Sequence, residues 1–213
     1  MAPSDPSQLQ FLKTTWNQLC SSYSDDITLK NKLFEQICRE YGNSSRYYHN
    51  LNHISAMLTL ADEHNDLIRH RDIVLFSIWF HDLVYDSLKK DNEEKSADMA
   101  EEMLTSLAIG KEAVQKIRKF IIATKSHSDH SEPDLCFFLD LDLSVLGSDS
   151  ETYSTYCKNV RKEYKWVPGI LYKKGRKKVL QHFLDMERIF KTDRFYELFE
   201  VKARKNIKRE LAS

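Results

Sequence analysis

The stretch Ile73–Asp86, IVLFSIWFHDLVYD, places a histidine and an aspartate at the end of an apolar run. Apolar residues fill almost every position before His81, which predicts a helix buried in the core over about residues 72–84. An imidazole and a carboxylate are costly to bury there unless another group compensates both. Adjacent helix residues point about 100° apart, yet a metal ion between the two directions can accept a bond from each. His81 and Asp82 are therefore candidate metal ligands, provided that other segments supply matching ligands.

Helical patterns lie on both sides of this stretch, because apolar residues recur at helical spacing in most segments. Helices are predicted over about residues 9–23, 27–41, 93–107, 111–124, 150–166, 174–189 and 193–211. A further helix is predicted to begin within residues 46–53 and to end at about residue 64. Leu135–Leu146 alternates leucine with Asp140 and Asp142 as a strand would, but its helical surroundings favour a helix. The sequence therefore predicts an all-α, single-domain helical bundle over residues 1–213. Residues 1–6 are expected to be a disordered lead, with Ser7 as a candidate N-cap.

The charge distribution of the chain limits the kinds of molecule that it is expected to bind. Lys+Arg and Asp+Glu balance at 32 each, so no global charge attracts a polyanion. Residues 158–213 hold 17 Lys or Arg against 7 Asp or Glu, which could attract phosphates, although solvated helix faces explain most of these charges. No aromatic-interleaved or Gly-rich motif accompanies them, which argues against a nucleic-acid partner.

Cysteine usage and hydropathy indicate the expected compartment. Cys20, Cys38, Cys136 and Cys157 lack CxxC spacing, and no signal peptide precedes them. A reducing, cytoplasmic location is therefore expected. The longest apolar run, Ile73–Phe80, is too short to span a bilayer, so no membrane segment is predicted.

Four polar residues beside apolar ones form a candidate ligand set. His53 lies at the start of a predicted helix, His81 and Asp82 inside another, and Asp142 in the leucine-rich one. Two imidazoles and two carboxylates suit Mn²⁺, Fe²⁺, Co²⁺, Ni²⁺ or Zn²⁺ better than an all-oxygen magnesium site. On a metal that accepts six ligands, these four would leave positions open for water and substrate.

The order H…HD…D at these positions resembles the HD-domain superfamily of metal-dependent phosphohydrolases, and within it a small group of predicted HD phosphohydrolases. The resemblance covers about residues 41–211 and runs through RYYHNLNH (46–53), WFHDLVYD (79–86), NEEKSA (92–97), FLDLDLSVLG (138–147), VRKEYKWVP (160–168) and the GR pair at 175–176. It implies an HD-type helical fold, a divalent metal at His53, His81, Asp82 and Asp142, and phosphoester hydrolysis. Asp142 is favoured over Asp140, which lies two residues earlier and would point to another helix face.

Two acidic residues are candidates for the general base. Glu94 and Asp86 could position the attacking water, take its proton, or hold a ligand imidazole through a hydrogen bond. A plainer role exists for Glu94, because a carboxylate in the first turn complements the positive end of a helix. Both interpretations stay open.

The expected substrate is a nucleotide or another small phosphoester, which needs positive charge around it. The substrate-binding candidates lie in or beside the resembling motifs: Arg46, Lys125, His127, Arg161, Tyr164 and Arg176. Tyr164 lies one helical turn after Arg161 and could close a pocket. His127 is either a substrate contact or an exposed loop residue, and each cation could instead be structural.

Two other functions fit the same residues. An HD-type di-iron oxygenase needs more histidine ligands, and only His127 is conveniently spare. A non-catalytic metal- or nucleotide-binding helical module would bind without turnover. Surfaces such as the two N-terminal helices could pair chains into a homo-oligomer, although nothing in the sequence requires it.

Overall fold

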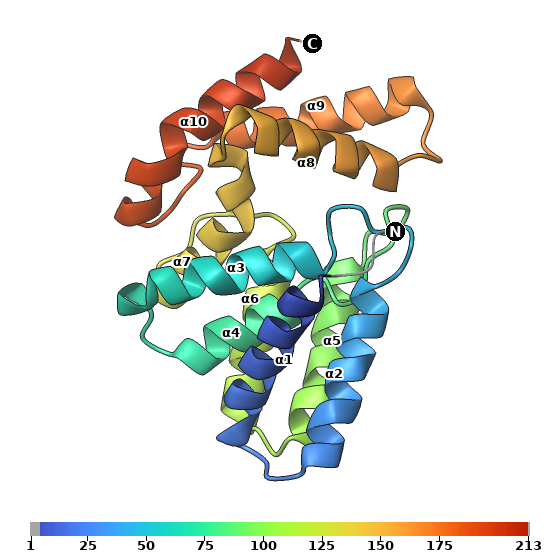
Figure 1. The fold of residues 1–213 in the computed structure, drawn as a ribbon. Helices are drawn as coiled ribbons and strands as arrows, with labels where there is room; N and C mark the ends of the chain where they lie inside the picture. Colours follow the sequence, from blue (N-terminus) through green and yellow to red (C-terminus); the bar gives the residue numbers. More distant parts are fainter. Residues whose placement is uncertain (1–4, 213) are drawn as a thin grey trace. The chain divides into compact units, whose positions relative to one another are not determined.

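The computed structural model describes residues 5–212, which form ten α-helices and two short 3₁₀ helices without a strand (Figure 1). This confirms the all-α prediction and fits a single-domain fold. Within the described chain, the residues up to Ser128 and those from Asp129 onward form two compact units.

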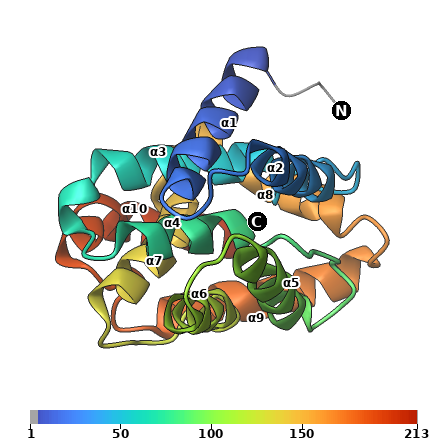
Figure 2. The same cartoon turned by 90° about the horizontal axis from the view of Figure 1, so that it is seen from below.

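The helix predicted from the opening stretch is the centre of the first unit. The unit contains α1 (Pro6–Ser21), α2 (Ile27–Tyr41), α3 (Leu51–Glu63), α4 (Arg71–Phe80), α5 (Asn92–Ser106) and α6 (Lys111–Ala123), with the 3₁₀ turn η1 (Asn65–Leu67) after α3. Helix α4 contacts α3, α5 and α6, and every residue from Val74 to Phe80 is buried. Figure 2 shows α5 and α6 nearly end-on and side by side.

An aromatic cluster joins the N-terminal helices to α4. The Trp16 ring of α1 packs edge-on against Phe76, Trp79 and Phe80, with centroids 5.5–6.2 Å apart. Its indole Nε1 donates to the carbonyl of Lys30 in α2, at 3.0 Å. Edge-to-face packing of this kind adds to the free energy of burial, so α1 and α2 are held firmly to the core.

The start of α1 differs from the prediction. The Asp5 carboxylate accepts a hydrogen bond from the Ser7 backbone N–H, and Pro6 is the first helical residue. Proline suits this position because its missing N–H would have no helical partner there. Asp5 rather than Ser7 is therefore the N-cap. Residues 1–4 of the predicted disordered lead lie outside the described residues.

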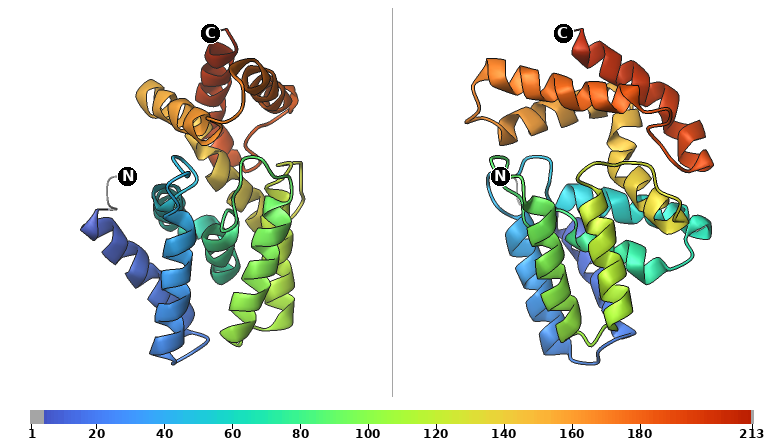
Figure 3. Two further views of the ribbon diagram at one scale, coloured as in Figure 1. Left: turned by 90° about the vertical axis from the view of Figure 1, so that its right-hand side faces the viewer. Right: turned by 180° about the vertical axis from the view of Figure 1, so that it is seen from behind.

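The second unit contains α7 (Pro133–Leu143), η2 (Ser144–Gly147), α8 (Ser150–Glu163), α9 (Gly169–Asp185) and α10 (Asp193–Leu211). The leucine-rich segment is helical, as predicted. Helix α9 begins at Gly169 instead of Lys174 and ends at Asp185 instead of Ile189. Helices α8 and α9 are joined by a short turn and lie side by side (Figure 3).

A close approach of η2 to α10 organises this unit. A Cβ atom on Gly147 would lie 2.5 Å from the Cβ of Phe199, so no side chain fits there. The Asn206 side chain of α10 donates to the carbonyls of Leu146 and Ser148, both at 2.9 Å. These two bonds satisfy buried carbonyls at the end of η2 and hold it against α10.

Candidate metal centre

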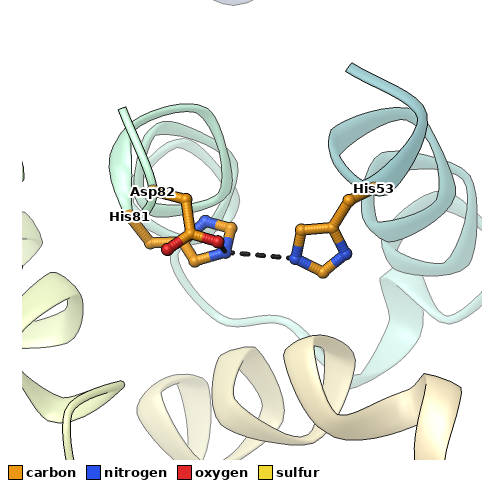
Figure 4. A group of neighbouring side chains, drawn as sticks. All are labelled: His53, His81 and Asp82. Atoms are coloured by element: carbon orange, nitrogen blue, oxygen red, sulfur yellow. Dashed lines mark hydrogen bonds and ion pairs between the residues drawn. The ribbon is translucent and has the colours of Figure 1, made fainter. Parts of the chain in front are cut away.

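His53, His81 and Asp82 bring their side chains together in the first unit (Figure 4). The Nε2 atoms of the two imidazoles are 3.2 Å apart, and Nε2 of His81 is 3.2 Å from Oδ2 of Asp82. One ligand atom from each residue lies within 4.8 Å of the others. Both histidines are buried, with 6% of His53 and 1% of His81 exposed. Three of the four predicted ligands thus converge.

The end of α4 corrects the prediction that His81 and Asp82 lie inside the helix. Helix α4 ends at Phe80, His81 is its C-cap, and Asp82 lies in the following turn. Both side chains turn toward His53 of α3 (Figure 4).

Arg46 stabilises this helix end from a distant part of the sequence. Its buried guanidinium donates to the backbone carbonyls of Asp82, at 2.6 Å, and Leu83, at 2.7 Å. The same group lies over the rings of Tyr41 and Tyr85. Only 3% of Arg46 is exposed. The structure therefore gives Arg46 a role in holding the turn that contains His81 and Asp82, whereas the sequence predicted a substrate contact.

The tautomer of His81 follows from its second ring nitrogen. Nδ1 lies 3.0 Å from the carbonyl oxygen of Ile78. A carbonyl only accepts hydrogen bonds, so Nδ1 must carry the proton and donate. In the neutral form of the ring, Nε2 is then the nitrogen whose lone pair is available to a metal ion. This is the arrangement by which proteins prepare an imidazole for a metal ion.

The donor set fits a divalent transition metal. Two imidazole nitrogens and a carboxylate oxygen are the mixture that such ions prefer. Two neutral ring nitrogens that face each other at 3.2 Å need a proton or a cation between them, since lone pairs repel. His53, His81 and Asp82 could hold such an ion, and positions beyond these three would be left for further ligands.

Asp140 and Asp142 both lie on α7 of the second unit but differ in their surroundings. The buried Asp140 carboxylate accepts hydrogen bonds from the backbone N–H groups of Lys191 and Thr192 and from the Thr192 hydroxyl. Burial raises the pKa of Asp140 to about 6, against the opposing effect of these bonds. Asp140 thus anchors the start of α10. Asp142 is half-buried, and its assignment as fourth ligand stays a prediction.

The two candidate bases have different partners. Glu94, in the first turn of α5, forms an ion pair with Lys125, which also donates to the carbonyl of Lys90 at 2.9 Å. The hydrogen bond from Lys125 lowers the pKa of Glu94, so this carboxylate is ionised at neutral pH. The exposed Asp86 accepts a hydrogen bond from the Leu88 backbone N–H and so shapes its own loop. The sequence did not predict the pairing of Lys125 with Glu94.

The remaining predicted substrate contacts lie in both units. His127, in the first unit, follows α6 with a positive φ of 50° and donates its backbone N–H to the carbonyl of Ala123. It therefore closes the end of the helix, a position at which non-glycine residues are uncommon. Arg161 and Tyr164 lie at the end of α8 in the second unit, where the Arg161 guanidinium donates to the Tyr164 and Val167 carbonyls.

Aromatic residues around the histidines were missed by sequence reasoning. The ring of Tyr48 packs against His53, with centroids 5.0 Å apart, and Tyr85 stacks on His49 at 4.3 Å. These contacts restrict the orientation of the His53 ring. The adjacent aromatic and histidine residues of RYYHNLNH were the available signal.

No protein-family model, curated protein or solved structure matches the chain. The resemblance to HD-type phosphohydrolases therefore stays a prediction that rests on the residues themselves. Two further observations concern the chain as a whole. All four cysteines are free thiols, and none of the described helices combines the length and apolarity needed to cross a bilayer.

Proposed function

We propose that the chain is a divalent-metal-dependent phosphohydrolase of the HD type, acting on a nucleotide or another small phosphoester. The observation that carries the proposal is the convergence of His53, His81 and Asp82 from α3 and the end of α4. The H…HD…D order of the sequence supports it independently. The burial of both imidazoles, together with the contact of His81 Nδ1 with the Ile78 carbonyl, supports a metal site over an incidental cluster.

In this proposal the metal ligands of the first unit are His53, His81 and Asp82, and the assignment of Asp142 as a fourth ligand rests on the sequence alone. When bound, a divalent ion would supply Lewis-acid polarisation of water and of a phosphoryl oxygen. The chain itself orients the ligands: the Ile78 carbonyl accepts a hydrogen bond from Nδ1 of His81, and Arg46 holds the backbone after α4. Both contacts reduce the freedom that the ligands would otherwise lose on binding an ion.

Glu94 is the proposed general base. Glu94 is ionised at neutral pH and could accept the proton of an attacking water, while its ion pair with Lys125 lowers its pKa and so its basicity. Asp86 is the second candidate, and its bond to the Leu88 backbone leaves one carboxylate oxygen for another partner.

The test is the metal content of the purified protein, measured by elemental analysis beside a His81→Ala variant and an Asp82→Asn variant. We expect about one transition metal per chain in the wild type and its loss in both variants. A panel of nucleotides and phosphomonoesters is then assayed with that metal for release of phosphate. His182→Ala is the matched control, because His182 is an exposed histidine of the second unit.

The possible outcomes separate the alternatives. Metal binding with phosphate release that disappears in both variants supports the phosphohydrolase. Two irons per chain with oxygen-dependent turnover would replace it with the oxygenase. A metal without any turnover would leave a binding module. Full activity in both ligand variants would refute the ligand assignment.

A further inference from the structure

The second unit contains a cavity of about 620 Å³ that the proposed function does not use. It lies among α8, α9 and α10, and all its lining residues belong to the second unit. Its volume is within the range of small-molecule sites, about 300–1,000 Å³.

Six cationic side chains line the cavity against a single carboxylate, that of Glu210. They are Lys158, Arg161 and Lys162 from α8, and Lys173, Arg176 and Lys177 from α9. Such an excess of one sign in a concave site raises the local concentration of ions of the opposite charge. An anionic ligand is therefore indicated.

The two arginines are fixed in place by the protein. Arg176 forms a two-point ion pair with Glu210, with nitrogen–oxygen distances of 2.8 and 3.1 Å, and it also donates to the Tyr156 hydroxyl. Arg161 donates to the carbonyls that end α8, and its guanidinium lies 4.7 Å from the centre of the Tyr172 ring. No carboxylate among the described residues is paired with Arg161 in these contacts, so its charge adds to the field of the cavity.

The lysines at the rim differ from the arginines. Lys158, Lys173 and Lys177 are exposed, and no ion pair to a carboxylate of the described chain occupies them. An ammonium on a flexible stem can move to meet a phosphate, which the fixed guanidinium groups cannot do. These three lysines are therefore the groups that a ligand would engage first.

The wall of the cavity also contains apolar surface. Tyr172, Leu180 and Leu211 contribute to the lining, and the Arg161 guanidinium covers one face of the Tyr172 ring. Inorganic phosphate would leave this surface in water. A ligand with a flat or apolar body would cover it and gain free energy from its burial.

We propose that this cavity binds a small organic molecule that carries two or more phosphate groups on a flat body, the class to which nucleoside di- and triphosphates belong. The lysines of α8 and α9 contact the phosphates, and Tyr172 with its leucine neighbours contacts the body. The residues that line the cavity are different from those of the metal cluster.

The experiment measures ATP binding by calorimetry with the full chain carrying His81→Ala, in the presence of a chelator. That background removes the proposed metal chemistry, so binding reports on the cavity alone. Inorganic tripolyphosphate carries the phosphate charge without a flat organic part, so it tests how much of the binding comes from charge alone. Vesicles with anionic lipids test whether the phosphate is instead part of a membrane surface.

A matched pair of variants locates the binding on α9. Lys173→Glu/Lys177→Glu changes two lining residues, whereas Lys174→Glu/Lys178→Glu makes the same charge change at the exposed neighbours that do not line the cavity. We expect the first pair to weaken ATP binding by at least about tenfold and the second by less than about threefold. All four positions are exposed, so the substitutions should leave the fold intact, and circular dichroism of each protein checks this.

Saturable ATP binding that is tighter than tripolyphosphate binding and sensitive only to the first pair supports the proposal. Equal losses in both pairs would mean non-specific charge attraction and would overturn it. Binding to vesicles without ATP binding would also overturn it, in favour of a membrane surface. Failure here leaves the proposed hydrolase intact, because the two tests use different residues and different measurements.

Discussion

Arg46 donates a hydrogen bond from its guanidinium to the backbone carbonyl of Asp82, 36 residues later, at 2.6 Å. A second bond, to the carbonyl of Leu83, fixes the direction of the chain directly after His81 and Asp82. The placement of the turn that contains His81 and Asp82 therefore depends on Arg46, a residue that offers no atom to a metal.

Replacing Arg46 should damage the metal site through its backbone. We expect Arg46→Lys to lower the free energy of unfolding by about 3 kcal/mol, because one ammonium cannot bridge both carbonyls and each charged hydrogen bond contributes about 1.5–3 kcal/mol. Metal affinity should fall with it. Urea denaturation and metal titration check both. Unchanged stability with a raised KM alone would restore the substrate-contact prediction.

Glu94→Gln should abolish turnover while leaving the metal bound. Loss of a general base typically lowers rates by about 10²–10⁴-fold, and Glu94 is not among the proposed ligands. Metal content and kcat/KM, measured on the same preparation, separate the two effects. A parallel loss of metal would make Glu94 a ligand instead of a base.

Lys125→Met should move the acid limb of the pH–rate profile. Lys125 lowers the pKa of Glu94, so its removal lets that pKa rise toward the ordinary value. A base acts only when it is ionised, and activity should therefore be lost at a higher pH than in the wild type. An acid limb that does not move would exclude Glu94 as the titrating base.

Asp140 and Asp142 should respond differently to the same change. Asp140→Asn leaves an amide facing the three donors at Lys191 and Thr192, which should destabilise the protein by about 2–3 kcal/mol. Asp142→Asn should retain stability and lose metal affinity. Thermal melting and metal titration of both variants form the comparison. If Asp140→Asn lost metal at normal stability, the choice between the two aspartates would be reversed.

Alanine substitutions at Gly147 and Gly175 should change the stability of the protein in opposite directions. Gly147→Ala would place a Cβ against Phe199 and should destabilise by about 1–3 kcal/mol, as overpacking does. Gly175 lies inside α9 with no atom near its missing Cβ, so Gly175→Ala should stabilise by about 0.5–1 kcal/mol. Urea midpoints of the two variants should move in opposite directions. A stabilised Gly147→Ala would contradict the close contact of η2 with α10.

Glu210 should make the second unit sensitive to acid. Burial acts to raise the pKa of Glu210, but the bonds from Arg176 and Tyr153 outweigh it, and the net shift is downward. The folded state thus binds this proton less readily than the unfolded state does. The stabilisation is present above about pH 4.5 and is lost as pH falls through the folded pKa.

The Glu210→Gln variant tests this linkage. It should be less stable than the wild type at pH 7 by about 2 kcal/mol, since Arg176 loses its charged partner. The difference should shrink as pH falls below about 4.5. Urea denaturation across this range gives both curves. A difference that is constant with pH would assign the stability to packing instead of charge.

Local spacing was enough to predict most of the helices and the ligand residue types. The period of apolar residues in Ile73–Phe80 predicts a buried helix, and that helix is the centre of the first unit. His53, His81 and Asp82 were predicted as ligands from their residue types and from the resemblance of the H…HD…D order to the HD-domain superfamily, and the structure brings these three together. The helix prediction succeeds because helical burial depends on residues within a short segment, whereas the meeting of His53 with His81 depends on the packing of α3 against α4.

Only the tertiary structure decided where α4 ends, what Arg46 contacts, and which carboxylate pairs with Lys125. Each depends on bonds between segments far apart in the sequence: Arg46 with Asp82, and Lys125 with Glu94. Such bonds leave no periodic pattern, because a guanidinium or ammonium on a long stem can reach many partners. The cavity of the second unit has the same origin, because residues of α8, α9 and α10 must come together to line it.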